Sequence, residues 1–218
     1  MLSFDQVSAV IVTRGNTDLT AVLDSLSAFD EIIVWDNSVE DDQMTYGRVR
    51  ALDRVRNRIV YSQDDDIIHT PENQRRILAA YQPGVLTGCM WPEWSDGARR
   101  QGIPDGYDDL VFCGSGSVYD RHLPAEAAAR YLARYPNDDF FLLWADTIIG
   151  ILAPNQQLNI QFDALPEAED DYRMCWLPDG VAQKTEAIRR AREVRDRKPG
   201  GHELRVAAAH ERAVRSLV

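Results

Sequence analysis

The 218-residue chain has few cysteines, almost no lysine and no long apolar run. Its three cysteines, Cys89, Cys113 and Cys175, are widely spaced and form no Cys-x-x-Cys pair. This argues against a disulfide framework and against a zinc–cysteine site, and it favours a reducing compartment. No apolar run approaches the roughly 20 residues that a membrane-spanning helix needs. The first five residues carry an acid and no base, so we expect no secretory signal.

Charge is unevenly distributed along the chain. The whole sequence has 24 basic and 35 acidic residues, a net charge of −11. Residues 184–218 contain ten Lys or Arg and five Asp or Glu, so their net charge of +5 leaves −16 for residues 1–183. An acidic body is typical of a soluble protein, or of one whose carboxylates hold metal ions. We therefore expect a catalytic domain over residues 1–183 and a basic helical extension over residues 184–218.

The first 66 residues alternate between strand and helix patterns. A short, continuous run rich in β-branched residues predicts a buried strand at residues 7–13, and the segments at 31–35 and 58–63 predict a second and a third strand. The intervening segments, 18–28 and 43–56, predict helices, with Thr17 as the N-cap of the first. This alternation predicts an α/β fold with a mainly parallel, Rossmann-like sheet flanked by helices.

Each of these three strands ends in polar residues, which is the most informative feature of the sequence. The endings are Thr13 and Arg14, then Asp36 and Asn37, then Asp64, Asp65 and Asp66. Because ligands bind beyond the carboxyl ends of parallel strands, we expect all three groups on one edge of the sheet. A simple turn is the alternative interpretation of Asp36 and Asn37, because both residue types favour turns.

The triple aspartate predicts a site for a divalent cation. Adjacent carboxylates repel one another, and a cation relieves this repulsion. Asp64 and Asp66 can converge because alternate residues point the same way, whereas Asp65 points elsewhere. Mn²⁺ and Mg²⁺ prefer oxygen ligands and are held by one or two carboxylates together with substrate phosphates. A solvated acidic turn is the alternative, and the position at the end of a buried strand favours the metal.

The second half of the chain has a less regular pattern. We expect, in order, a helix from Thr70 to Pro83, a strand at 85–90, a long loop at 92–109 and a strand at 110–119. Gly114 and Gly116 interrupt this last strand and indicate a bulge or a close ligand approach. Helices are expected at 125–134, 138–153 and 202–217, and residues 184–198 are expected to form a charged helix or a linker.

Asp146 stands in a helix that is otherwise apolar on all sides. None of its neighbours three or four residues away can pair with it. A carboxylate there is costly unless something outside the helix compensates it. Asp146 therefore either faces a pocket with a catalytic role or forms a buried salt bridge with an arginine.

Taken in order, these motifs resemble the GT-A glycosyltransferases, whose Asp-x-Asp motif holds the metal of a nucleotide-sugar. The strand endings and the triplet followed by Ile67 are similar to the exostosin-type family and to small bacterial and phage glycosyltransferases. Residues 114–119 resemble that family's Gly-rich segment near the acceptor. Residues 137–152 resemble its Asn-x-Glu-Asp helix, with Ala145 in place of the glutamate. Asn57-Arg58 resembles an Asn-Arg pair that contacts the nucleotide.

The resemblance implies a role for each candidate residue. Asp66, with Asp64 directly or through water, binds Mn²⁺ or Mg²⁺, and Asp65 holds the ribose or the donor sugar. The nucleoside pocket of a UDP-sugar is lined by Thr13, Arg14, Asp36, Asn37 and, as a weaker addition, Arg58. Asp146 is the catalytic residue, as general base if the enzyme inverts or as acceptor-orienting group if it retains. His202 is either a further metal ligand or an ordinary capping histidine.

The acceptor is expected to offer a hydroxyl group, and a hydroxymethylated base in phage DNA is one candidate. The basic segment supplies a candidate phosphate-binding face, formed by Arg189, Arg190, Arg192, Arg195, Arg197 and Lys198. A solvated helix is the alternative, because acidic residues are interspersed. The resemblance places the protein in the cytoplasm of a bacterium or of a phage-infected cell, with no membrane partner.

Two other functions stay open at this point. One is a metal-dependent nucleotidyltransferase, which would release pyrophosphate. Against it, Gly15 stands alone after the first strand, where a triphosphate-binding loop would be rich in glycine. The other is a non-catalytic module that binds a nucleotide-sugar.

Overall fold

The computed structural model describes residues 2–89, 111, 113–161, 163–164 and 178–197. Six strands form the main sheet: β1 (Val7–Thr13), β2 (Ile32–Asp36), β3 (Ile59–Asp64), β5 (Leu86–Cys89), β6 (Ser115–Asp120) and β7 (Asn155–Leu158). A small second sheet pairs β4 (Ile67–Ile68) with β8 (Asp163–Ala164). The described helices are α1 (Thr20–Ser25), α2 (Gly47–Ala51), α3 (Pro71–Ala79), α5 (Leu123–Leu132), α6 (Ala145–Leu152) and α7 (Gly180–Asp196). Short 3₁₀ turns η1 (Phe4–Gln6), η2 (Met44–Tyr46) and η3 (Leu52–Arg54) complete them.

The main sheet is mixed but mainly parallel, with strand order β2-β1-β3-β6-β5-β7. β1 is the second strand from the β2 edge of the sheet and pairs in parallel with both β2 and β3. β6 runs antiparallel to its two neighbours, β3 and β5, and β5 pairs in parallel with β7. The predicted α/β fold with a mainly parallel sheet is confirmed.

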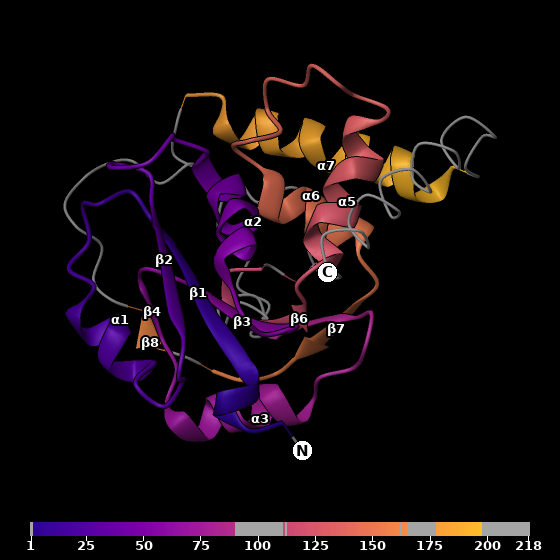
Figure 1. The fold of residues 1–218 in the computed structure, drawn as a ribbon. Coiled ribbons are helices and arrows are strands. Elements are labelled where there is room, and N and C mark those ends of the chain that lie inside the picture. Colours follow the sequence, from indigo (N-terminus) through magenta and orange to yellow (C-terminus); the bar gives the residue numbers. More distant parts are fainter. Residues whose placement is uncertain (1, 90–110, 112, 162, 165–177, 198–218) are drawn as a thin grey trace.

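Helices cover both faces of this sheet, so the protein has three layers (Figure 1). On one face α2, α5, α6 and α7 pack over alternate strand residues such as Val10 and Val60. On the other face α1 and α3 pack over the intervening residues, among them Ile11 and Tyr61. Because both faces are buried, most residues of β1 are apolar on both sides, whereas β3 also buries Ser62 and Gln63.

Several local predictions agree with the structure. The strands at 7–13, 31–35 and 58–63 appear as β1, β2 and β3 within one residue. Thr70 is the N-cap of α3, where its hydroxyl oxygen accepts a hydrogen bond from the Asn73 amide at 3.2 Å. The expected bulge in the glycine-containing strand is present, because the β3–β6 register shifts between Ser62 and Gln63.

Other local predictions need correction. Thr17 is not the N-cap of α1, because Leu19 occupies that position and makes no side-chain cap bond. One residue earlier, the Asp18 carboxylate accepts a hydrogen bond from the Thr20 amide at 2.9 Å. The helix predicted at 138–153 begins only at Ala145, because residues 139–144 form turns. The short strands β4, β7 and β8 were not predicted. The loop at 92–109, the helix at 202–217 and His202 lie outside the described residues.

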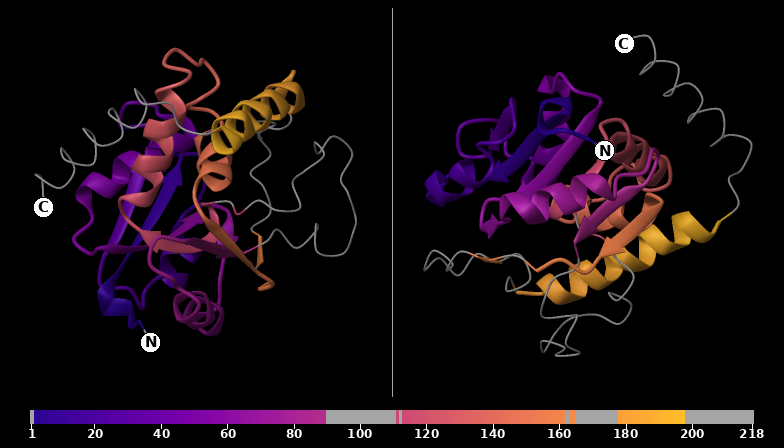
Figure 2. Two further views of the ribbon diagram at one scale, coloured as in Figure 1. Left: turned by 90° about the vertical axis from the view of Figure 1, so that its right-hand side faces the viewer. Right: turned by 90° about the horizontal axis from the view of Figure 1, so that it is seen from below.

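Helix α7 packs directly on the helical layer of the fold. Figure 2 shows it lying alongside α6 from two further directions. Ala187, Ile188 and Ala191 of α7 are buried in the same apolar cluster as residues of α5 and α6. The predicted boundary between residues 183 and 184 falls inside this helix. Within the described segments no helix has both the length and the apolar character needed to cross a bilayer.

Candidate active site

The polar ends of the three parallel strands lie side by side at one edge of the sheet. In the β1–β2 ladder Thr13 stands opposite Asp36, and in the β1–β3 ladder Val12 stands opposite Asp64. The register therefore brings Thr13, Asp36 and Asp64 to neighbouring positions, as expected for the carboxyl edge of a parallel sheet. Arg14 follows directly after β1 on the same edge and is partly exposed.

The β2 ending forms a tightly bonded turn. The Asp36 carboxylate accepts hydrogen bonds from the Ser38 amide at 2.8 Å and from its hydroxyl at 2.6 Å. The side-chain oxygen of Asn37 accepts from the Trp35 indole at 3.0 Å and from the Gln43 amide at 3.0 Å. These hydrogen bonds belong to a turn, which was the alternative interpretation of Asp36 and Asn37. Binding of a nucleoside by this pair stays a prediction.

Asp65 faces the end of β1. Its carboxylate accepts hydrogen bonds from the hydroxyl groups of Thr13 and Thr17. Burial, reinforced by the charge of Asp64, raises the pKa of Asp65 although these two bonds oppose the shift. Thr17 thus bonds the Asp65 carboxylate rather than capping a helix. Through these hydrogen bonds Asp65 links the end of β3 to the end of β1.

Asp64 points to the opposite side, toward the helical layer. Its carboxylate forms an ion pair with Arg48 of α2, whose guanidinium also donates to the Ser62 hydroxyl at 2.7 Å. The side chain of Arg48 is only 4% exposed, whereas that of Asp64 is 35% exposed. The carboxylate lies against Gly114, where a Cβ atom would approach it to within 1.9–2.3 Å. Only glycine at position 114 leaves room for this carboxylate.

Asp146 lies in the first turn of α6, close enough to Asp64 and Arg48 to feel both charges. Burial, followed by repulsion from Asp64, raises the pKa of Asp146 to about 6. One oxygen, Oδ1, accepts from the Thr147 amide at 2.6 Å. The turn before α6 is tied to the turn before α2, because the Thr45 hydroxyl donates to the Leu142 carbonyl at 3.0 Å. The contact explains how two distant segments place Asp146 beside Arg48.

Lys184 of α7 is a further charged residue near Asp64 and Asp146. Its Nζ lies 5.1 Å from the centre of the Trp144 ring, two residues before Asp146. Burial lowers the pKa of Lys184 to about 7, against the opposing effect of the Asp64 charge. The site therefore contains two cations, Arg48 and Lys184, that sequence reasoning missed.

A pattern in the sequence does point to both of these cations. Arg48 shares one face of the helical segment 44–54 with Thr45 and Leu52, both buried. Lys184 lies four residues after Gly180 and three before Ala187, on the buried face of α7. A charged residue at an apolar position of an amphipathic helix is therefore the signal that would have found them.

Arg58 does not lie with the other candidates. It precedes β3, so it stands at the strand end opposite Asp64, about 20 Å away for a strand of this length. There it forms an ion pair with Asp120 at 2.8 Å, next to the Tyr81 hydroxyl. We therefore remove Arg58 from the predicted nucleotide site.

The carboxylates suit a divalent cation that is shared with a substrate. Among the described residues no group of three or more His, Cys, Asp or Glu side chains forms a complete metal cage. Mn²⁺ and Mg²⁺ do not require one, because one or two carboxylates and the substrate's phosphates suffice. The charge of Asp64 helps to raise the pKa of Asp146, and a cation between the two carboxylates would oppose that shift. Asp64 and the partly exposed Asp66 fit the role of ligands.

The sequence matches no protein-family model and no curated protein. Solved structures do match the fold. A mycobacterial protein superposes with a TM-score of 0.53 at 15% identity, over 90% of this chain and 77% of that one. Glucosyl-3-phosphoglycerate synthase from Mycobacterium tuberculosis, in complex with Mn²⁺, UDP and phosphoglyceric acid, superposes with a TM-score of 0.50 at 14% identity, over 90% of this chain and 80% of that one.

The same synthase in complex with Mn²⁺, UDP-glucose and phosphoglyceric acid gives a TM-score of 0.50 at 15% identity, with coverage of 90% and 81%. The fold is similar to that of the GT-A glycosyltransferases. At such identities the likeness concerns the fold. Both synthase complexes contain Mn²⁺.

Proposed function

We propose that this protein is a metal-dependent glycosyltransferase that moves a sugar from a nucleotide-sugar to a hydroxyl acceptor. The observation that carries the proposal is the acidic triplet at the carboxyl end of β3, with Asp146 of α6 facing Asp64 across the site. On a GT-A-like sheet this edge is where a nucleotide and its metal are expected.

The residues of the site divide into donor-binding and acceptor-facing groups. Asp64 and Asp66 would hold Mn²⁺ or Mg²⁺, and Asp65, fixed by Thr13, would contact the ribose or the donor sugar. Stabilisation of the leaving diphosphate by a Lewis acid is the chemistry that the cation supplies when bound. Arg48 orients Asp64 for this role, because its buried guanidinium fixes one carboxylate oxygen.

Asp146 would act on the acceptor hydroxyl. Its Oδ1 is anchored by Thr147, and no donor among the described residues bonds its Oδ2. A carboxylate whose pKa is raised to about 6 is a stronger base than an ordinary aspartate and is still ionised at neutral pH. Oδ2 would therefore accept the hydrogen bond of the hydroxyl group, as general base in an inverting reaction or as orienting group in a retaining one.

We infer a UDP-sugar as donor, because the synthase of similar fold was solved with UDP and with UDP-glucose. DNA is a weaker candidate for the acceptor. Arg189 and Arg190 both bond Glu186, and Arg190 also pairs with Asp138 at 2.9 Å. These arginines are engaged in ion pairs rather than presented as a phosphate-binding row. A small hydroxyl compound is the acceptor that this arrangement favours.

Thermal-shift measurements with a panel of nucleotide-sugars, each with and without Mn²⁺, test the proposal. A ligand present at 100 times its Kd adds about 2.7 kcal/mol to the stability of the folded state. We expect one nucleotide-sugar to raise the Tm only in the presence of Mn²⁺. Asp66→Asn should abolish this rise, whereas the matched control Arg58→Ala, at the far end of β3, should retain it.

The products then distinguish transfer from the alternatives. A glycosyltransferase releases a nucleoside diphosphate when an acceptor is added. Release of pyrophosphate from a nucleoside triphosphate would instead identify a nucleotidyltransferase. If the nucleotide-sugar binds but no transfer or hydrolysis occurs, and Asp146→Asn leaves binding unchanged, the protein is a binding module. Absence of any Mn²⁺-dependent shift across the panel would refute the proposal.

A further inference from the structure

Lys184 occupies an unusual position on α7. The inward face of this helix carries Gly180, Ala187, Ile188 and Ala191, all of them buried. Lys184 falls on the same face by helical spacing, where a small or apolar residue would pack at lower cost. Apolar packing on α6 therefore does not account for the amine at this position.

The amine of this side chain reaches the candidate active site. Its Nζ lies over the Trp144 ring at 5.1 Å from the ring centre, a distance typical of a cation–π contact. It also lies within electrostatic range of Asp64. Trp144 directly precedes the helix that carries Asp146. Lys184 thus approaches the acidic group from the helix that the sequence had assigned to a separate extension.

Arg48, the other basic residue of the site, is bound to the protein itself. It is 3% exposed, and its two terminal nitrogens are engaged by Ser62, by the Gln63 carbonyl and by Asp64. Its guanidinium therefore holds Asp64 in place, whereas the side chain of Lys184 is partly exposed. A flexible, compact ammonium group is well suited to contact phosphate oxygens.

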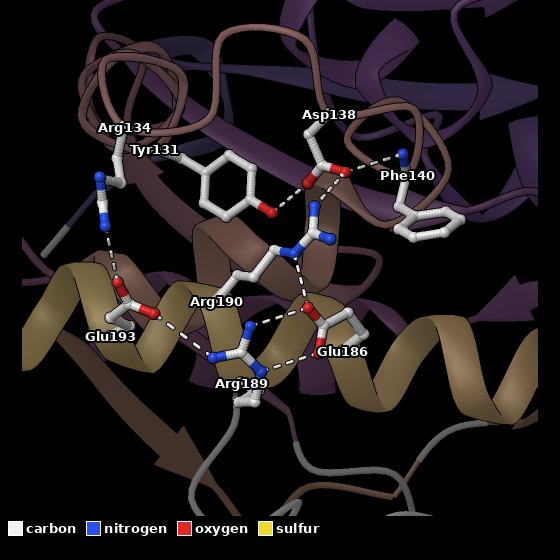
Figure 3. Close-up of polar contacts among 8 residues, drawn as sticks. All are labelled: Tyr131, Arg134, Asp138, Phe140, Glu186, Arg189, Arg190 and Glu193. Atoms are coloured by element: carbon white, nitrogen blue, oxygen red, sulfur yellow. Dashed lines mark hydrogen bonds and ion pairs between the residues drawn. The ribbon is translucent and has the colours of Figure 1, made fainter.

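A network of ion pairs fixes α7 and therefore Lys184 (Figure 3). Arg190 donates to Asp138 at 2.9 Å, and the Asp138 side chain is only 1% exposed. Asp138 also accepts hydrogen bonds from the Tyr131 hydroxyl of α5 and from the Phe140 amide at 3.1 Å. Since Arg190 lies six residues after Lys184 on the same helix, the network determines where the lysine stands. Such pre-organisation lowers the cost of binding an anion.

We propose that Lys184 binds a phosphate group of the substrates, as a cationic contact that α7 contributes beside the acidic triplet. The inference rests on the proposed function for the identity of its ligand. Two sources supply that phosphate: the diphosphate of the nucleotide-sugar, or a phosphate carried by the acceptor. A phosphate beside Nζ would also favour the charged form of an amine whose pKa burial lowers to about 7.

Three variants of the full chain test this role. Lys184→Met removes the charge and keeps an unbranched apolar side chain, and Lys184→Arg keeps the charge. Arg75→Met, which removes an exposed cation of α3 on the other face of the sheet, is the control. Calorimetry measures the Kd of UDP, of inorganic pyrophosphate and of uridine, each with Mn²⁺, and the Kd of 3-phosphoglycerate in the presence of UDP and Mn²⁺.

If the donor is the source, Lys184→Met weakens UDP and pyrophosphate binding by about 10- to 100-fold, the loss of one charge-assisted hydrogen bond, and leaves uridine unchanged. If the acceptor is the source, only 3-phosphoglycerate binding weakens. Lys184→Arg should restore most of the affinity, and Arg75→Met should change none of it. We expect the Tm of ligand-free Lys184→Met to equal or exceed that of the wild type, since a buried charge is removed.

Unchanged affinity of Lys184→Met for all four probes would overturn the inference while leaving the proposed function intact, provided that the wild type binds UDP. A lower Tm with unchanged affinities would assign Lys184 a purely structural role as counter-ion of Asp64, which also overturns it. If the wild type binds pyrophosphate but no nucleotide, the proposed function fails, and the loss of pyrophosphate binding in Lys184→Met still supports the lysine's role. Binding of neither by the wild type refutes both.

Discussion

Replacing Asp146 by asparagine should make the protein more stable at neutral pH and inactive. Burial and the charge of Asp64 raise the pKa of Asp146 to about 6 in the folded protein. In the unfolded chain it returns to the ordinary value of about 3.9. Each unit of difference corresponds to about 1.4 kcal/mol, so ionised Asp146 costs the folded state about 3 kcal/mol.

The sign of this effect depends on pH. Below about pH 4 the carboxyl is protonated in both the folded and the unfolded chain, and the cost is absent. Between about pH 4 and pH 6 the folded protein binds more protons than the unfolded one, so stability falls as the pH rises. Above that range both states are ionised and the full cost remains. Asp146→Asn should therefore gain up to about 3 kcal/mol at pH 7.5 and nothing at pH 4.

Urea unfolding followed by tryptophan fluorescence measures this difference, with EDTA present at each pH. Asp30→Asn, which removes an exposed carboxylate at the other edge of the sheet, is the control. Added Mn²⁺ should narrow the gap between Asp146→Asn and the wild type, because a bound cation offsets the repulsion. Equal stabilities at pH 7.5, or a difference that does not vary with pH, would refute the reasoning.

Three further substitutions have outcomes that the contacts predict. Asp64→Asn leaves the buried Arg48 guanidinium without its charge partner and should lower the free energy of unfolding by about 3 kcal/mol in urea titrations. Gly114→Ala would place a Cβ atom within 1.9–2.3 Å of the Asp64 carboxyl and should abolish the Mn²⁺-dependent Tm rise with donor. Its control is Gly84→Ala, at a position with open space around it and a φ of +74°. This control should lower the free energy of unfolding by only about 1–2 kcal/mol and should retain the Tm rise. Asp138→Asn weakens the contacts that fasten α7 and should destabilise the protein by about 3 kcal/mol while raising the Kd of pyrophosphate. A Tm unchanged by Asp138→Asn would contradict the role given to that network.

Some features of this site could be predicted from local sequence because they depend on the chain's own periodicity. β1 is a mostly apolar run, whereas β3 buries Ser62 and Gln63 before it ends at Asp64. The acidic triplet marks the end of β3 in the sequence, because three adjacent carboxylates are too costly to bury within a sheet. Strand direction also excludes Arg58, because a residue just before a strand lies a full strand length away from a residue at its end.

Other features of the fold could not be predicted from local sequence patterns. The strand β7 reads Asn-Gln-Gln-Leu, which has no apolar alternation, and it forms only because β5 offers it a parallel partner at the sheet edge. The helix α6 was expected to start seven residues too early, since the apolar residues before Ala145 pack as turns against Tyr46 and Tyr131 rather than as a helix. In both cases tertiary contacts override the local preference.

The sequence by itself determined the parallel strands, their polar endings and the acidic triplet, because strand periodicity and the direction of parallel pairing are local properties of the chain. Only the tertiary structure decided which cations stand beside that triplet. Arg48 and Lys184 are separated by more than a hundred residues in sequence, and the packing of α2 and α7 over one face of the sheet brings both within electrostatic range of Asp64. Helical spacing marks each of these two positions as unusual, but which carboxylate the two side chains approach depends on distances in space that only the packing sets.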